Sequence, residues 1–206
     1  MSEMTRRVLM TVLGVSASGV AVGFFSLSGM GFDPFQCFSH GVWSLTPLDY
    51  GTFYAIVNAV LLVLILLVNR KKVGLGTLIN LFLLGYIAEG SEDLLRLLVP
   101  DPSLPMRFLF LVIGINLLCF ASAVYFTGDL GVSTYDAVAI TIAEKQTKVP
   151  FHLIRIGTDL VCVGIGFALG APVGIGTLVT AFFMGPLIDL FRRTAAEPMR
   201  YGRRTQ

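Results

Sequence analysis

Six long apolar runs constrain this sequence more than any other feature. They lie at residues 7–28, 51–69, 74–95, 106–127, 150–170 and 173–191. The hydrocarbon core of a bilayer is about 30 Å thick, and a helix of about 20 residues crosses it. The runs are continuous rather than alternating, and lipid offers the backbone no hydrogen bonds, so helices are the expected form. The sequence therefore predicts an all-α membrane protein, a single transmembrane domain over residues 1–206 with six transmembrane helices.

The composition narrows the function classes. Charged residues make up 14% of the chain, against about 25% in soluble domains. The net charge of +2 and the lack of a basic patch among aromatic residues argue against nucleic-acid binding. Three distant cysteines without a CxxC pair predict neither disulfides nor a zinc site. No nucleotide-binding, metalloprotease or serine-hydrolase motif is present, so we expect no enzyme activity, cofactor or metal.

The basic residues predict the orientation of the spans. They precede the first run, lie between the second and third and between the fourth and fifth, and follow the sixth. With six crossings, all four basic groups fall on one side, which the distribution of Lys and Arg in membrane proteins identifies as the cytoplasm. We therefore expect both termini in the cytoplasm, with residues 193–206 forming a basic tail.

The sequence also contains an internal repeat at a fixed offset of one hundred residues. "VGLGTL" at 73–78 returns as "VGIGTL" at 173–178, and five glycines align without a gap over the wider comparison. Each unit, 7–100 and 106–192, contains three spans. Because three is odd, the second unit enters the membrane from the opposite side. The prediction is two inverted-topology repeats related by a pseudo-two-fold axis in the membrane plane.

Each unit has a short segment after its first span that cannot cross the membrane. Glycine-rich breaks in "SGMGFDPFQCFSHGVW" and "GDLGVSTYDAVAITIAEK" are followed by helices of about ten residues. Asp33 is the expected N-cap before Pro34, and Ser133 with Asp136 resembles a capping box. These helices either lie at the interface and cover the bundle end, or dip into the membrane with their N-termini facing an anion.

Two of these stretches carry a family resemblance. "VGIGTLVTAFFMGPLID" and "GDLGVSTYDAV" resemble the YczE/YyaS/YitT group of bacterial membrane proteins, most strongly over residues 106–191. The resemblance implies a small multi-pass protein of the bacterial cytoplasmic (inner) membrane. It implies no established substrate or reaction. The first unit has "GFDPFQ" where the second has "GVSTYDA", so a site lined by both would not be symmetric.

Ionisable residues within apolar runs are candidate functional residues, because burying them in a membrane is costly. His152, Arg155 and Asp159 share one helical face, which predicts either an ion-coupled site or a structural Arg–Asp pair. Glu89 and Asp189 occupy matching positions in the two units. They either line two gates or mark the ends of the third and sixth spans.

The leading functional hypothesis is a secondary transporter or channel-like carrier of a small solute or ion. Its pathway would use Arg155 and Asp159 with Asp33 and Asp136 from the short helices, and Glu89 and Asp189 at its ends. It predicts a polar cavity bounded by residues 31–36, 131–136 and 155–159. The alternative is a membrane chaperone, regulator or subunit of a larger complex that transports nothing, with a protein partner besides the lipid bilayer.

Overall fold

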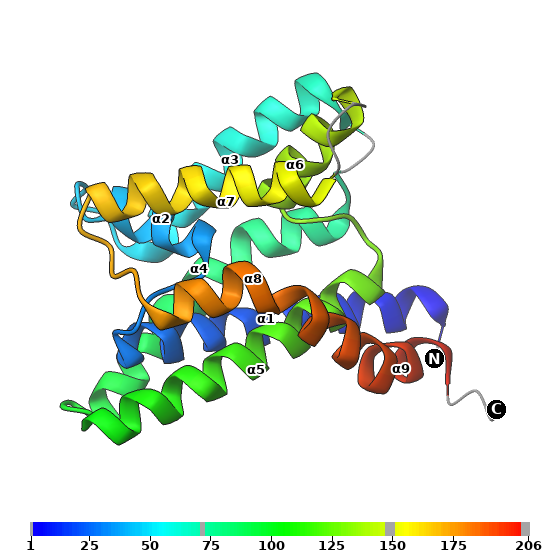
Figure 1. Cartoon of the computed structure of the whole chain (residues 1–206). Helices are drawn as coiled ribbons and strands as arrows, with labels where there is room; N and C mark the ends of the chain where they lie inside the picture. The colour runs from blue at the N-terminus through cyan, green and yellow to red at the C-terminus, as the bar shows by residue number, and fades with distance from the viewer. Residues whose placement is uncertain (1, 71–72, 147–150, 203–206) are drawn as a thin grey trace.

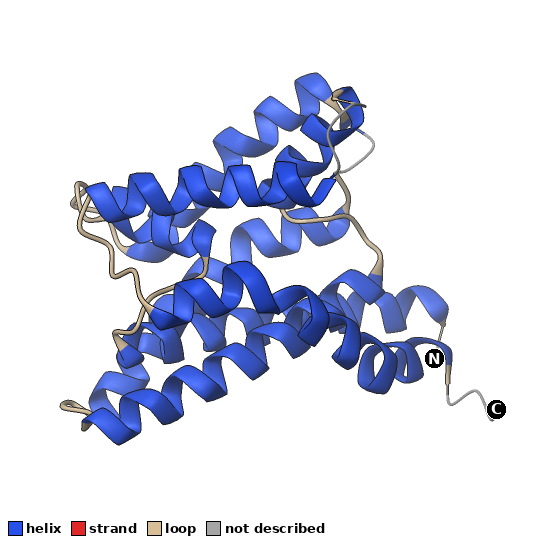
Figure 2. Cartoon of the chain, viewed as in Figure 1, coloured by secondary structure: helices blue, strands red, loops and turns tan. Residues whose placement is uncertain are grey.

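The computed structural model describes residues 2–70, 73–146 and 151–202, without the side chains of Phe151 and His152. The prediction for the His152 side chain thus lies outside the described residues. Every regular element in the described part is helical (Figure 2), as predicted. The elements are α1 (Glu3–Ser28), α2 (Pro34–Trp43), α3 (Tyr50–Val68), α4 (Leu75–Leu98), α5 (Leu104–Gly128), α6 (Thr134–Lys145), α7 (Phe151–Ala168), α8 (Ile175–Phe191), a π-helical segment (Arg192–Ala196) and α9 (Glu197–Tyr201).

Four helices in the described residues are long and apolar enough to cross a membrane. They are Glu3–Ser28, Tyr50–Val68, Leu104–Gly128 and the continuous stretch Ile175–Tyr201. The two other predicted spans, 74–95 and 150–170, correspond to α4, which carries Glu89, and to α7, which carries Arg155 and Asp159. The last span also differs in length, because its helix continues through the π-helical segment into the region predicted as a tail.

The helices form two groups (Figure 1). In one group α1 packs along α5, α4 packs on α1, and α8 packs on α5. In the other, α2 packs against α7 and α3 packs against α6, while α3 also contacts α4. The start of α1 and the end of α9 lie at the same end of the molecule, where the guanidinium of Arg6 donates to the carbonyl oxygen of Arg200 at 2.7 Å.

Small residues allow the long helices to approach closely around α1. A Cβ added at Gly14 would lie 2.8 Å from the carbonyl oxygen of Ala121 on α5. A Cβ at Gly23 would lie 2.4 Å from the hydroxyl oxygen of Ser91 on α4. Membrane helices gain little from the hydrophobic effect between one another, so close backbone packing of this kind contributes much of their association energy.

The repeated motifs make crossed contacts between the two halves of the chain. The N–H of Gly76 donates to the carbonyl oxygen of Leu130 at 2.7 Å, and the N–H of Gly176 donates to that of Met30 at 2.9 Å. The start of each motif helix thus packs on the loop that follows the first long helix of the other half. Both loops turn at a glycine, Gly31 with φ 101° and Gly131 with φ 110°.

Candidate functional site

The caps of the two short helices place two carboxyl groups at corresponding ends. The carboxylate of Asp33 accepts from the N–H of Gln36 at 3.3 Å and caps α2, as predicted. The hydroxyl of Ser133 accepts from the N–H of Asp136 at 3.1 Å and donates to its carboxylate at 2.7 Å, which fixes that side chain at the start of α6. Local capping therefore orients both acidic groups.

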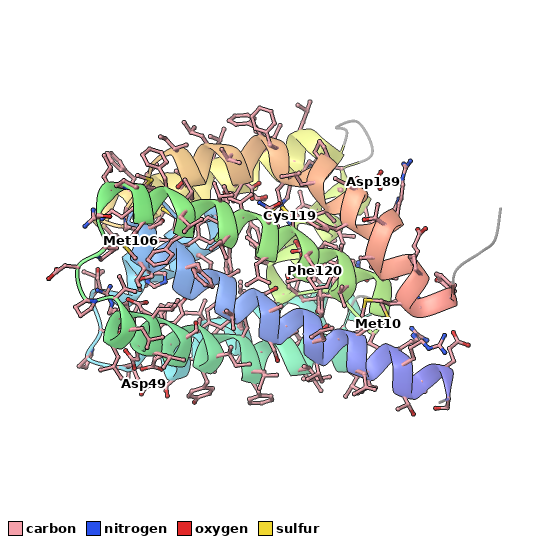
Figure 3. The ribbon with its side chains drawn as sticks, turned by 90° about the horizontal axis from the view of Figure 1, so that it is seen from below. Met10, Asp49, Met106, Cys119, Phe120 and Asp189 are labelled. Atoms are coloured by element: carbon pink, nitrogen blue, oxygen red, sulfur yellow. The ribbon has the colours of Figure 1, made fainter. Side chains whose placement is uncertain are left out.

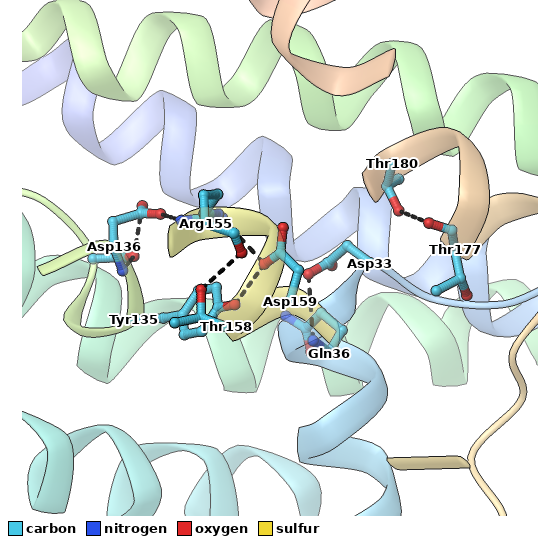
Figure 4. Close-up of polar contacts among 10 residues, drawn as sticks. Asp33, Gln36, Tyr135, Asp136, Arg155, Thr158, Asp159, Thr177 and Thr180 are labelled. Atoms are coloured by element: carbon cyan, nitrogen blue, oxygen red, sulfur yellow. Dashed lines mark hydrogen bonds and ion pairs between the residues drawn. The ribbon is translucent and has the colours of Figure 1, made fainter. Parts of the chain in front are cut away.

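A charged network joins α6 to α7 (Figure 4). The guanidinium of Arg155 pairs with the carboxylate of Asp136, and its Nε lies 3.4 Å from the carboxylate of Asp159. The hydroxyl of Tyr135 donates to Asp159, and the guanidinium lies 4.7 Å from the centre of the Tyr135 ring. Asp159 is only 8% exposed. Because a buried carboxylate is costly unless it is paired, this network offsets part of the cost of burying Asp159.

Residues of α2 complete the site. The ring of Phe35 stacks on that of Tyr135, with centroids 4.8 Å apart and planes 17° from parallel. These two aromatic residues occupy matching positions at the offset of one hundred. Asp33 lies beside Asp159 in Figure 4, and it interacts electrostatically with both Asp159 and Arg155. The two short helices and α7 therefore meet at one place.

A cavity of about 1030 Å³ opens beside this network. The three segments expected to bound a polar cavity, 31–36, 131–136 and 155–159, all contribute residues to its lining. Four of the six candidate residues lie there: Asp33, Asp136, Arg155 and Asp159. Further polar lining comes from Ser18, Gln36, Tyr54, Asn80, Ser122, Tyr125 and Thr180.

The charges around this cavity are unequal. The carboxylates of Asp33, Asp136 and Asp159 face a single guanidinium, that of Arg155. Asp129 also lines the cavity, but its carboxylate lies 3.1 Å from a guanidinium nitrogen of Arg7. One arginine cannot pair with all three, so the acidic groups outnumber the basic ones among the described residues that line the cavity. Such a low-dielectric cleft attracts cations.

Glu89 and Asp189 lie apart from this site. The carboxylate of Glu89 accepts from the N–H of Gly51 at 2.9 Å and thereby caps the start of α3. Asp189 lies at the edge of the molecule in Figure 3, where it pairs with Arg192 at 2.6 Å and Arg193 at 2.7 Å. Neither side chain lines the cavity. Neither residue ends its helix, because α4 continues from Glu89 to Leu98 and the helix of Asp189 continues to Tyr201. Their roles as gates or as span ends stay predictions.

Tyr125 is a polar cavity residue that the sequence analysis missed. Its side chain is 5% exposed, and its hydroxyl has no hydrogen-bond partner among the described residues. A buried hydroxyl without a partner costs about 1–3 kcal/mol. Its position, one aromatic residue within a long apolar run, gives no sequence signal of this role. The orphaned hydroxyl is a hydrogen-bonding group available to a ligand in the cavity.

We expect Tyr125→Phe to leave the free energy of unfolding unchanged or to raise it by about 1 kcal/mol in the absence of ligand, because it removes an unpaired buried group. Thermal unfolding in detergent measures this change. Tyr50→Phe is a matched control that removes a hydroxyl bonded to the side-chain oxygen of Gln36, and this variant is expected to lose about 1 kcal/mol. A comparable loss in Tyr125→Phe would show that its hydroxyl has a partner.

Phe35 and Tyr135 were also missed as site residues, although the repeat contained a signal for them. They align at the offset of one hundred, two positions after Asp33 and Ser133. The repeat marks the two rings as an equivalent pair, but equivalence in a repeat does not by itself bring two residues into contact. In the described residues, no group of three or more His, Cys, Asp or Glu side chains is arranged to hold a metal ion.

Comparisons with known proteins agree with the family resemblance and name no activity. The profile of a family of unknown function, DUF6198, matches residues 5–193. An uncharacterised protein of Haemophilus influenzae is 31% identical over 87% of this chain and 80% of its own length. The uncharacterised membrane protein YczE of Bacillus subtilis is 24% identical over 77% of this chain and 72% of its own length. YyaS of the same organism, also uncharacterised, is 22% identical over 87% and 89%. No solved structure matches.

Proposed function

This chain belongs to the DUF6198 family, and we propose that it is a secondary transporter or channel-like carrier of a small cationic solute or ion. The membrane protein among its relatives and its four long apolar helices support a membrane location. The observation that carries the proposal is the cavity of about 1030 Å³ whose described wall holds four aspartates, one of them paired with Arg7 outside the lining, and one arginine, Arg155. Ionisable groups are expensive in a membrane protein and mark solute or ion pathways. We assign it no enzyme activity.

We further propose that the chain is an inverted repeat with six spans, with α4 and α7 completing the set. In support, each half contains one long helix, one short helix and two further helices in the same order, and the two sets are related by the offset of one hundred residues. The Gly76–Leu130 and Gly176–Met30 hydrogen bonds also exchange the same positions between the halves. In transporters of this architecture the substrate binds where the repeats meet, at broken or short helices. The basic loops support an orientation in a bacterial inner membrane with both termini in the cytoplasm.

Transport by the purified chain tests the proposal. The protein is reconstituted in proteoliposomes, and uptake of radiolabelled tetramethylammonium is driven by a potassium diffusion potential that makes the interior negative. We expect uptake well above that of protein-free liposomes. A thermal-shift titration on the same protein gives a second measurement, because a ligand at 100 times its Kd adds about 2.7 kcal/mol to the free energy of unfolding.

Asp159→Asn is expected to lower uptake at least tenfold, because it removes a negative charge from the cavity while it keeps the side chain's shape. Asp93→Asn is the matched control, since it makes the same change at an exposed position of α4 and should transport like the unchanged protein. No uptake by the purified chain, together with no thermal shift, would overturn the carrier. Equal uptake by both variants would remove Asp159 from the pathway.

A further inference from the structure

The cavity of about 1030 Å³ described above is called the acidic cavity here. A second hollow lies on the other side of one of its walls. It is a groove of about 630 Å³ between α3, α6 and α7, with an apolar lining that includes Leu61, Val138, Ile142, Ile154, Val161 and Ile165. Val161 is 62% exposed in the isolated chain. We call this hollow the apolar groove. Its exposed aliphatic side chains suit the hydrocarbon of a bilayer or of a ligand tail, not water.

Two residues belong to the walls of both hollows, and they are the stacked pair Phe35 and Tyr135. Their rings, 4.8 Å apart, separate the apolar groove from the acidic cavity. Tyr135 bonds to Asp159 and lies under the guanidinium of Arg155. Phe35 and the guanidinium of Arg155 already occupy the Tyr135 ring, so a cationic group that reaches this wall meets the carboxyl groups of Asp33 and Asp159 beside an aromatic pair.

We infer that the substrate is an amphiphilic cation, whose charged head binds in the cavity beside Asp33 and Asp159 while its apolar chain extends past the Phe35–Tyr135 pair into the groove. This inference rests on the proposed carrier function and names its substrate class. The juxtaposition of an acidic cavity and an apolar groove across one aromatic pair favours such a ligand over a hydrated metal ion. A hydrated ion has no apolar part to fill the groove.

Affinity as a function of chain length tests the inference. The probes are tetramethylammonium, butyltrimethylammonium and hexyltrimethylammonium, with hexanoate as an anion of similar length. Binding is measured by calorimetry on the full chain in phosphatidylcholine nanodiscs, and the heat for empty nanodiscs is subtracted. Two buried methylenes are expected to tighten binding about fifteenfold from the butyl to the hexyl compound, and hexanoate is expected not to bind.

Two glycines of α7 provide a matched pair of variants. A Cβ added at Gly157 or at Gly164 meets no atom within 4 Å, so both sites accept a side chain. Gly157 lines the apolar groove and Gly164 does not. Gly157→Leu fills the groove, and we expect the hexyl-to-butyl affinity ratio to fall from about fifteen to about one. Gly164→Leu is expected to keep the ratio near fifteen.

The outcomes separate this inference from the carrier function. Binding and uptake of tetramethylammonium without a gain from chain length would overturn the amphiphilic substrate and leave the carrier standing. The same would follow if Gly157→Leu kept the full ratio, or if both leucine variants lost it equally. Failure of every cation to bind or cross, the tetramethyl compound included, would overturn the carrier function and the substrate class with it.

Discussion

Replacing Arg155 by glutamine is expected to lower the free energy of unfolding by about 3 kcal/mol. The side chains of Asp136 and Asp159, which pair with Arg155, are only 18% and 12% exposed. Removing one partner of such a pair leaves buried charge uncompensated, a loss of about 3–5 kcal/mol. Arg155 is itself 33% exposed, which places the expected effect at the lower end. For a chain of this size the Tm in detergent should fall by about 10 °C.

The matched control for this experiment is Arg193→Gln. Arg193 also pairs with an aspartate, Asp189 at 2.7 Å, but its side chain is 71% exposed. Exposed pairs contribute about 1 kcal/mol or less, so its Tm should change little. Adding Asp136→Asn and Asp159→Asn to Arg155→Gln is expected to recover most of the stability, because the uncompensated charges are then gone. Equal losses in Arg155→Gln and Arg193→Gln would contradict a buried network.

Gly74→Ala and Gly174→Ala are expected to cost about 3 kcal/mol or more each. The new Cβ would lie 2.2 Å from the carbonyl oxygen of Leu130 in the first variant and 2.6 Å from that of Met30 in the second. Both glycines have extended backbone that alanine also adopts, so the cost is steric. The opposing atoms are backbone oxygens at the crossed contacts, which move only if those contacts break, and overpacking of this kind is destabilising.

Two other glycines, one on α4 and one on α8, have free space around them and provide controls. Alanine at these positions is expected to stabilise the protein rather than to destabilise it. A Cβ at Gly90 on α4 or at Gly185 on α8 meets no atom within 4 Å. Alanine is favoured over glycine in a helix by about 0.5–1 kcal/mol, so Gly90→Ala and Gly185→Ala should raise the Tm slightly. A large loss at Gly74 alone, with Gly174→Ala tolerated, would contradict equivalent roles for the two motifs.

Features set by local sequence could be predicted, and several are confirmed. The N-caps Asp33 and Ser133 depend on neighbours three residues away, so their patterns predict α2 and α6. The family resemblance is also confirmed, because YczE and YyaS are both among the relatives. Of the six spans predicted from apolar runs, four correspond to described helices that are long and apolar enough to cross a membrane. The inverted topology, the orientation and the transport function stay predictions.

Features set by tertiary contact could not be read from the sequence. The spacing of Arg155 and Asp159 predicted a pair within α7, which exists at 3.4 Å, but a closer partner of Arg155 is Asp136, on another helix. Glu89 was predicted to line a gate or to mark the end of a span, and its contact with the N–H of Gly51 on α3 is a product of helix packing that neither prediction contained. Such partners depend on which helices pack together. The spacing of polar residues along one helix predicts that they share a face, but it does not identify the residue that they contact on another helix.

The crossed contacts at Gly76 and Gly176 have a consequence for biosynthesis. The N–H of Gly76 donates to a carbonyl oxygen at residue 130, and the carbonyl oxygen of Met30 accepts from an N–H at residue 176. In both pairs one partner is synthesised long before the other. A ribosome that has made only the first half has therefore produced a helix start and a loop that each lack their hydrogen-bond partner. The two halves reach their final arrangement only after nearly the whole chain has entered the membrane.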